Sequence, residues 1–277
     1  MTERAPSLAN AANARPVALV TGASSGIGRA IALALAEAGH AVVLAARRVP
    51  LLDEVAAAIR ARGGAALVAP CDATDRDAVA GVVAAALATF GRLDVVVANA
   101  GVYARKPADQ VQRADLQAAF TANFWSAFEL IQACLPHLLA QGRGQIVLIN
   151  SFDAKKGLPQ DAAYVAAKSA LAGYAATLRQ AVRDRGVHVC TVFPGRVDTP
   201  MIDDLEVPAI SAKIPPERVA RAVLRALRRR RAEVVVPWHC RLLHWADVLS
   251  PRLGDWFVRR LRLDGRPRQR PAPPGAR

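Results

Sequence analysis

Residues 17–28 read VALVTGASSGIG, a short apolar run that leads through a glycine-rich turn into a helix. Gly22 allows the tight turn, Gly26 lets the backbone approach a pyrophosphate, and Gly28 lets the helix pack closely on the strand. The free N–H groups at the N-terminus of such a helix favour phosphate. This strand, turn and helix therefore predict a dinucleotide-binding unit.

Outward from this unit, short β-branched runs alternate with long Ala- and Leu-rich segments. Each short run is apolar throughout, which indicates strands buried on both faces of a parallel sheet. We predict strands at 17–21, 41–45, 66–71, 93–98, 145–150, 187–193 and 233–236. We predict helices at about 26–38, 51–61, 75–89, 109–140, 162–185 and 216–230. The alternation predicts an α/β fold: a doubly wound, Rossmann-type, mainly parallel seven-stranded sheet with helices on both faces.

The chain divides into one large domain and a smaller extension. We expect a Rossmann-type dinucleotide-binding and catalytic domain over residues 15–236, because no linker interrupts it. A helical C-terminal extension is expected over 237–264. Residues 1–14, and a basic tail over 265–277 that is rich in Pro, Gly and Arg, are expected to be disordered.

The extension begins with an apolar stripe at helical spacing, formed by Trp238, Leu242, Trp245 and Leu249. Ser250-Pro251 then has the residue types of an N-cap and first position, so a second helix is expected over about 251–262. Three interpretations of this basic segment stay open: packing on the sheet domain or a second subunit, contact with an anionic membrane surface, or contact with nucleic acid. Packing on protein is our first expectation, and no nucleic acid is expected.

Composition excludes several classes of protein. The 277 residues are 53% hydrophobic, and no apolar run is long enough to span a membrane. The first sixteen residues lack the apolar core of a signal peptide, and the four cysteines form no CxxC pair. We therefore expect a cytoplasmic protein with reduced thiols, with peripheral membrane association as an alternative. His239, Cys240 and His244 lie close together, but no fourth ligand is near, so no metal site is expected.

Positive charge gathers near the C-terminus. The net charge is +14, and sixteen arginines and four acids from Arg218 onward account for +12 of it. Arginine outnumbers lysine 32 to 5, a bias that GC-rich codon usage also produces. The high isoelectric point, about 10.8, is therefore weak evidence for a nucleic-acid partner.

The end of the second predicted strand indicates which dinucleotide is bound. An acid here would accept a hydrogen bond from the adenine ribose of NAD, but the sequence reads LAARR over 44–48. Arg47 can instead pair with a 2′-phosphate, which favours NADP(H), although NAD(H) remains acceptable.

A further group of residues has the chemistry of proton transfer. Tyr164 and Lys168 are four residues apart, so they share one face of a helix. A nearby ammonium favours phenolate and lowers the pKa of a tyrosine. Ser151 follows the fifth strand, and ligands bind at the carboxyl ends of strands in open α/β sheets. Tyr164 can then exchange a hydroxyl proton while hydride moves at carbon.

At this point the sequence resembles the short-chain dehydrogenase/reductase family, from about Pro16 to Thr199. TGxxxGIG matches Thr21 to Gly28, and PGxxxT matches Pro194 to Thr199. The family's NNAG appears as ANAG over 98–101, with Ala98 in place of the first Asn. The resemblance implies a catalytic tetrad of Asn123, Ser151, Tyr164 and Lys168.

The resemblance also implies a role for each residue. Tyr164 is the general acid or base, Lys168 holds the nicotinamide ribose, and Ser151 binds the substrate oxygen. Asn123 holds a water that connects Lys168 to solvent, and Asp72 contacts adenine. The residues expected at the cofactor are Gly22, Ser24, Ser25, Gly26, Ile27, Gly28, Arg47, Asp72, Asn99, Gly101, Tyr164, Lys168, Pro194, Gly195 and Thr199.

The expected function is an NADP-dependent oxidoreductase that transfers hydride between NADP(H) and a carbonyl or secondary alcohol substrate. The alternative is a cofactor-sensing or scaffold protein whose turnover is incidental. We expect a homo-oligomer, a dimer or tetramer. Substrate contacts are expected within 102–106, 152–160 and 196–214, where apolar and charged residues mix and no single substrate is indicated.

Overall fold

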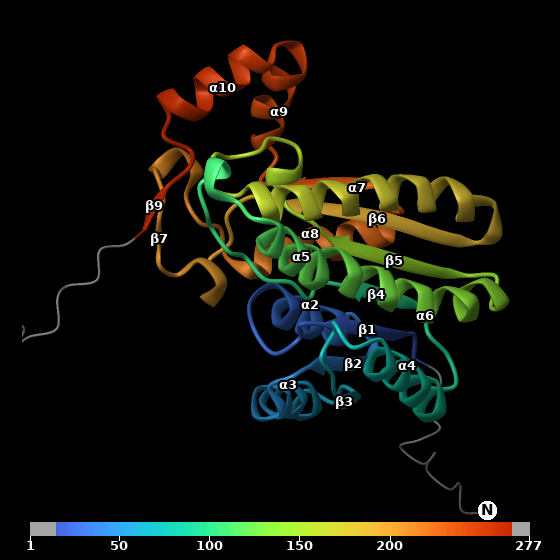
Figure 1. Cartoon of the computed structure of the whole chain (residues 1–277). Coiled ribbons are helices and arrows are strands. Elements are labelled where there is room, and N and C mark those ends of the chain that lie inside the picture. The colour runs from blue at the N-terminus through green and yellow to red at the C-terminus, as the bar shows by residue number, and fades with distance from the viewer. Residues whose placement is uncertain (1–14, 268–277) are drawn as a thin grey trace, which may run out of the picture.

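The computed structural model describes residues 15–267, and the predicted disorder of 1–14 and 268–277 lies outside these described residues. A seven-stranded sheet forms the centre of the described part (Figure 1). Its strands are β1 (Val17–Thr21), β2 (Ala41–Ala46), β3 (Ala66–Pro70), β4 (Val95–Ala98), β5 (Gly144–Ile149), β6 (Val187–Pro194) and β8 (Glu233–Val236). The order is β3-β2-β1-β4-β5-β6-β8, and every neighbouring pair is parallel. The predicted fold class is confirmed.

Helices cover both faces of the sheet. The helices are α2 (Gly26–Glu37), α3 (Val49–Ala61), α4 (Arg76–Phe90), α6 (Ser126–Ala140), α7 (Ala162–Val182) and α8 (Pro216–Arg229). Val17 and Leu19 of β1 pack with α4, α6 and α7, whereas Ala18 and Val20 pack with α2, α3 and α8. Strand side chains alternate between the faces, so an apolar run buries both.

The topology places a cleft beside β1. The chain runs outward from β1 through β2 to β3 and then returns to β4 on the other side of β1. Ligands bind at such a reversal of strand order, outside the carboxyl ends of the strands. The glycine turn after β1 and the segment after β4 therefore face each other.

The helix predicted over 109–140 begins four residues too early. A short 3-10 turn (Ala108–Gln110) is followed by α5 (Arg113–Phe120), a π-helical turn (Thr121–Trp125) and α6. The carboxylate of Asp115 accepts a hydrogen bond from the backbone N–H of Gln112, so a new helix starts there. The other predicted bounds agree with the structure to within three residues.

The C-terminal extension forms a helical hairpin of α9 (Cys240–Leu249) and α10 (Pro251–Arg260), which stands beyond the strand ends (Figure 1). Its last residues, β9 (Arg266–Pro267), pair antiparallel with β7 (Leu205–Glu206). The predicted start of the tail at residue 265 is therefore too early.

The hairpin does not bury its apolar stripe. α9 has no buried residue, and its stripe faces outward. The expected packing of this stripe on the sheet domain is therefore wrong. No helix within 15–267 combines the length and apolarity needed to cross a bilayer.

Candidate active site

A cleft of about 560 Å³ opens at the carboxyl ends of the strands. Thirteen of the residues predicted from the sequence line it: Gly22, Ser24, Ser25, Gly26, Ile27, Arg47, Asp72, Asn99, Gly101, Asn123, Tyr164, Lys168 and Thr199. Four predicted residues are outside its lining: Gly28, Ser151, Pro194 and Gly195. The structure thus brings together residues that follow five strands (β1, β2, β3, β4 and β6) with residues of α2, the π-helical turn and α7.

The glycine turn forms a cradle that a larger side chain would fill. Gly22 has a φ of +66°, and a Cβ there would lie 2.7 Å from the Asn99 side chain. A Cβ on Gly26 would lie 2.9 Å from Thr199, and one on Gly28 would lie 2.3 Å from the Gly22 carbonyl. Glycine at 22, 26 and 28 therefore allows the turn to pack closely on itself, on Asn99 and on Thr199, and the positive φ at Gly22 and Gly26 favours glycine further.

Thr21 and Asn99 join the ends of β1 and β4. The Asn99 backbone N–H donates to the Thr21 hydroxyl over 3.0 Å, and its side-chain amide donates to the Thr21 carbonyl over 2.9 Å. Ala98, which stands where the family has another Asn, is buried in β4. The backbone that would contact a cofactor is therefore fixed by Asn99 and Thr21.

Two arginines lie at the end of the cleft beside β2. Arg48 donates to the hydroxyls of Ser24 and Ser25 over 3.0 and 2.6 Å, so it bridges the end of β2 and the glycine turn. Arg47 is exposed and lies 3.7 Å from the Asp72 carboxylate. The sequence analysis named Arg47 and missed Arg48, although two adjacent arginines after the second strand already indicated that either could bind a phosphate.

Asp72 is held by its own turn. Thr74 donates to it through its backbone N–H and its hydroxyl, over 2.9 and 2.8 Å. These hydrogen bonds, together with Arg47, hold the pKa of Asp72 below its usual range. Asp72 thus presents a charged carboxylate at the margin of the cleft.

Lys168 is a buried ammonium. Its Nζ donates to the Ile149 carbonyl over 3.0 Å and lies 5.8 Å from the centre of the Tyr164 ring. Burial lowers its pKa to about 8. No carboxylate pairs with it among residues 15–267. A buried cation that faces the cleft without a counter-ion fits the hydroxyls and phosphates of a dinucleotide.

The π-helical turn positions Asn123. Its side chain donates to the Ala119 carbonyl over 3.0 Å and accepts from the Val102 N–H over 3.2 Å. A Cβ on Gly101 would lie 2.6 Å from the Asn123 Oδ1 and 3.7 Å from the Lys168 Nζ. Glycine at 101 therefore permits the close approach of Asn123 to the segment beside Lys168.

Ser151 is fixed by a short hydrogen-bond chain. Its N–H donates to the Asn150 side chain over 2.7 Å, and Asn150 donates to the Lys168 carbonyl over 3.0 Å. The Ser151 hydroxyl donates to the Asp153 carboxylate over 3.0 Å. Asp153 lies within the segment 152–160 predicted to contact substrate, but its hydrogen bond with Ser151 was not predicted.

The pKa of Tyr164 differs from the expectation. Burial raises it, the charge of Asp153 raises it further, and a hydrogen bond with Ser151 opposes the rise. The Lys168 ammonium lies 5.8 Å from the centre of the Tyr164 ring and donates to the Ile149 carbonyl. Tyr164 is therefore a protonated phenol in this state.

A buried polar cluster borders Tyr164. The Tyr103 ring packs edge-on to the Tyr164 ring, with centroids 5.0 Å apart. Asp161 accepts hydrogen bonds from the Tyr103 hydroxyl over 2.8 Å and from the Arg105 Nε over 3.2 Å. Burial raises the pKa of Asp161, and burial followed by the charge of Asp161 raises the pKa of Asp153 to about 6.

Two arginines of this region hold the C-terminal segment in place. Arg105 donates to the Asp264 carbonyl over 2.6 Å, and Arg196 donates to the Leu263 carbonyl. Cys240 and Leu243 of the hairpin pack with Phe152 and Phe193. The extension therefore forms part of the wall beside the predicted substrate segments.

Comparison with known proteins gives a consistent result. A family model described as short chain dehydrogenase matches residues 16–208. The chain is 33% identical over 216 residues to a fatty acyl-CoA reductase of Acinetobacter baylyi, covering 77% of this chain and 73% of that protein. It is 34% identical over 221 residues to the ketoacyl reductase HetN of a Nostoc species, covering 79% and 77%.

Solved structures agree in fold. A 7α-hydroxysteroid dehydrogenase in complex with NADH and 7-oxo glycochenodeoxycholic acid has a TM-score of 0.73 and 26% identity, covering 82% of this chain and 95% of that chain. A dehydrogenase/reductase from Burkholderia phymatum in complex with NAD has a TM-score of 0.77 and 25% identity, covering 85% and 95%.

Proposed function

Because the chain belongs to the short-chain dehydrogenase/reductase family and is an oxidoreductase that uses a nicotinamide cofactor, we propose that it reduces a carbonyl substrate with NADPH, with Tyr164 as the proton donor. The observation that carries the proposal is the juxtaposition of Tyr164 with the buried, unpaired ammonium of Lys168 at the cleft. In the reverse direction the same residues would oxidise a secondary alcohol.

The bound cofactor supplies the hydride, and the protein supplies orientation and the proton. Tyr164 donates its phenolic proton to the carbonyl oxygen as negative charge develops there. Ser151 donates a hydrogen bond to the same oxygen. To do so, its hydroxyl must turn away from the Asp153 carboxylate, to which it donates in this structure. Lys168 holds the ribose hydroxyls and repels the remaining protons of the site. Asn123 holds a water through which the proton is replaced.

Preference for NADPH is supported by the charge around the adenine end. Arg47 and Arg48 lie there with the hydroxyls of Ser24 and Ser25, and Ala46 stands at the end of β2, where an NAD-binding protein has an acid. These groups would bind a 2′-phosphate through charge-assisted hydrogen bonds. The two similar solved structures hold NADH and NAD. The proposed preference for NADPH therefore rests on the residues of this chain alone.

An apolar carbonyl compound is the proposed substrate class. Phe152, which follows Ser151 in the chain, forms a small buried apolar cluster with Phe193, and Leu243 packs against that cluster. The Tyr103 ring packs on Tyr164. Two relatives are a fatty acyl-CoA reductase and a ketoacyl reductase, whose names also describe carbonyl groups on acyl chains. We propose that the protein acts as a homo-oligomer in the cytoplasm, in keeping with its family.

A panel of acyl, keto and steroid carbonyl compounds tests this function with NADPH and with NADH. We expect turnover with at least one apolar carbonyl and a lower dissociation constant for NADPH. The alternative function is a cofactor sensor. Tight NADPH binding with no turnover across the panel would favour that alternative and contradict the enzyme assignment.

A further inference from the structure

The hairpin of α9 and α10 presents an exposed apolar surface, which we call the hairpin face. It consists of Trp238, Leu242, Trp245, Val248, Leu249, Leu253 and Trp256. Trp238 is 68% exposed and Leu249 is 81% exposed, so these side chains are covered by nothing in the described part of the chain. Soluble monomers rarely expose a contiguous apolar patch of this kind, so a partner is implied.

Two acids of the hairpin, Asp247 and Asp255, pair with a lysine of the sheet domain, although the Asp255 side chain remains exposed. Lys156, which is only 9% exposed, lies between the carboxylates of Asp247 and Asp255, at 2.6 and 2.7 Å. A Cβ on Gly254 would lie 2.3 Å from the Asp247 carboxylate, so glycine there allows α10 to close on α9. The single positive charge of Lys156 offsets one of the two negative charges and fixes the hairpin to the loop after β5, so one acid charge remains against the arginines of the hairpin.

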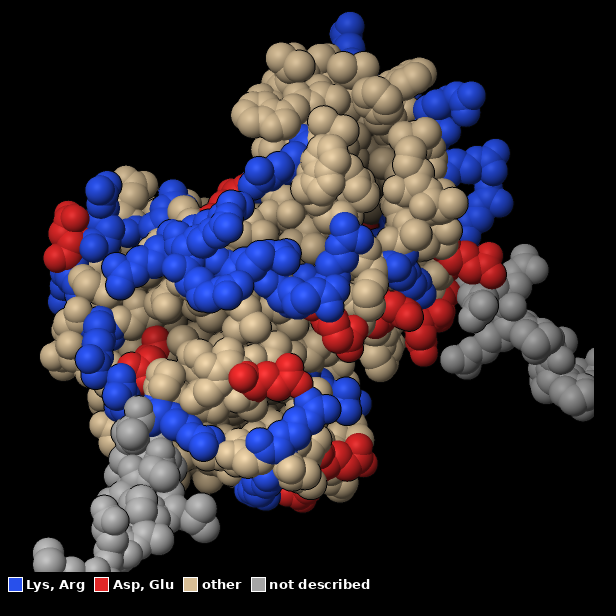
Figure 2. Space-filling view, turned by 180° about the vertical axis from the view of Figure 1, so that it is seen from behind, with Lys and Arg blue, Asp and Glu red and all other residues tan. Residues whose placement is uncertain are grey.

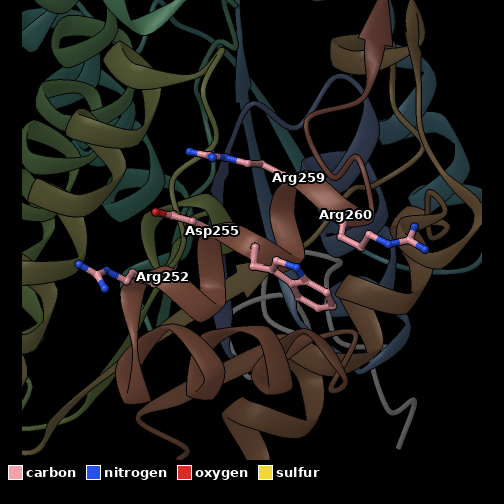
Figure 3. Close-up of a pocket in the computed structure, with 5 residues that line it drawn as sticks. Arg252, Asp255, Arg259 and Arg260 are labelled. Atoms are coloured by element: carbon pink, nitrogen blue, oxygen red, sulfur yellow. The ribbon is translucent and has the colours of Figure 1, made fainter.

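The exposed charges of the hairpin are mainly positive. Its exposed arginines are Arg241, Arg252, Arg259, Arg260 and Arg262. Arg252, Asp255, Trp256, Arg259 and Arg260 line a shallow hollow of about 520 Å³ on α10. In Figure 3, Arg252, Asp255 and Arg259 extend from one side of α10 and Arg260 from the other. Cations thus flank the apolar side chains on both sides.

A basic band continues below the hairpin. Figure 2 shows uncharged side chains over much of the upper lobe and a belt of Lys and Arg side chains beneath it. Helix α8 lies below the hairpin in Figure 1 and exposes Arg218, Arg221, Arg225, Arg228 and Arg229. None of these five forms an ion pair within residues 15–267.

The arginines around the hairpin face indicate whether a second copy of the chain or another partner covers it. A two-fold dimer through the hairpin face would place the same arginines of both copies against each other. Like charges brought together in this way oppose association. A partner with an anionic surface and an apolar interior would instead pair with the arginines and bury the tryptophans at the same time.

We propose that the hairpin face binds the surface of a bilayer that contains anionic lipid. Tryptophans are favoured at the boundary between head groups and acyl chains, and arginines near it attract anionic head groups. The apolar stripe of Trp238, Leu242, Trp245 and Leu249 enters the interface, and Arg252, Arg259 and Arg260 bind lipid phosphates. This binding does not depend on the proposed reaction.

Flotation of the full-length protein with vesicles tests the proposal. Vesicles of phosphatidylcholine alone are compared with vesicles that contain 30% phosphatidylglycerol, at low and high salt. We expect the protein to float with the anionic vesicles at low salt and to be released several-fold at high salt, because exposed charges are screened. Leu249→Asp and Arg252→Glu should each reduce the bound fraction about tenfold.

Helix α5 supplies matched control variants. Leu116 is 37% exposed and Arg113 is exposed, and both lie outside the hairpin. Leu116→Asp and Arg113→Glu make the same chemical changes and should leave flotation unchanged. Circular dichroism confirms that each variant is folded.

Three outcomes would overturn the proposal. The first is no flotation with anionic vesicles at low salt. The second is an equal loss of flotation in the α5 variants. The third is a soluble dimer that ignores vesicles and dissociates in Leu249→Asp, which would assign the hairpin face to a second copy of the chain.

Discussion

The Asp153 carboxylate lies beside Ser151 and Tyr164, and its negative charge disfavours ionisation of the Tyr164 phenol. It accepts the Ser151 hydroxyl hydrogen, and its charge raises the pKa of Tyr164. A phenol whose pKa is raised gives up its proton with more difficulty, so the charge on Asp153 disfavours the phenolate needed for alcohol oxidation. The same charge keeps Tyr164 protonated for carbonyl reduction.

Removing the Asp153 charge should therefore shift the pH profile. In Asp153→Asn we expect the pKa of Tyr164 to fall, because the charge that raises it is gone. The rise of kcat with pH for alcohol oxidation should then move to lower pH by about half a unit or more. An unchanged profile would show that Asp153 and Tyr164 do not interact.

The stability of the same variant gives an independent measurement. The pKa of Asp153 is about 6 in the folded protein and is raised from 3.8 chiefly by burial. The unfolded chain thus loses this proton at lower pH than the folded protein, and the free energy of unfolding falls as pH rises from about 4 to 6. Asp153→Asn should raise the melting temperature more at pH 8 than at pH 4.

Tyr164 and Lys168 should separate proton transfer from cofactor binding. Tyr164→Phe removes the transferable proton, so kcat should fall by about 10²- to 10⁴-fold with NADPH binding retained. Lys168→Ala should lose turnover and also weaken NADPH binding. Stopped-flow turnover and cofactor fluorescence measure the two effects, and near-normal turnover of the Phe variant would disprove the role of Tyr164.

Arg48 should contribute to the choice of cofactor. Arg48→Ala and Arg47→Ala should each weaken NADPH binding by roughly 1–3 kcal/mol and affect NADH far less, since only NADPH carries the 2′-phosphate. Arg76→Ala is the control, because Arg76 is exposed and lies on α4, outside the cleft lining. Equal affinity of the wild type for NADPH and NADH would contradict this assignment.

Among the elements, the Lys156 ion pairs should hold the hairpin in place. Lys156→Met removes the partner of Asp247 and Asp255 and leaves two carboxylates unpaired at the base of the hairpin. Amide hydrogen exchange in α9 and α10 should accelerate by about tenfold or more, with β4 and β5 unchanged.

Lys106→Met is the matched control for this experiment. Lys106 pairs with Asp115 at 2.6 Å, but it is 36% exposed and lies far from the hairpin in sequence. Its loss should leave exchange in α9 and α10 unaltered. Equal acceleration in both variants would show that Lys156 has no specific part in fixing the hairpin.

The strands could be predicted because each is a continuous apolar run, whereas the π-helical turn between α5 and α6 could not. The π-helical turn adds one residue to a turn of helix without a residue type that marks it. The polar cluster was also missed, because Arg105 and Asp161 are 56 residues apart and meet only through the topology. The family motifs did predict most of the cleft lining, since these residues lie directly at strand ends.

At the scale of the whole molecule, periodicity predicted which hairpin residues share a face but not what that face contacts. Trp245 and Leu249 were expected against the sheet domain or a second subunit, and at 58% and 81% exposed they are not covered by the sheet domain. Apolar residues at helical spacing predict only that their side chains lie on the same face of a helix. The direction in which the stripe points is set by Lys156 and Gly254, which lie on the opposite side of the hairpin.

The uneven distribution of charge makes the molecule a strong electric dipole. Most of the net charge of +14 belongs to residues from Arg218 onward, and the hairpin, which carries exposed arginines, stands at one end of the structure (Figure 1). A dipole rotates in the field of a negatively charged surface before contact, so the protein would approach such a surface with this end leading. Raising the ionic strength would therefore lower the fraction of collisions with such a surface that lead to binding.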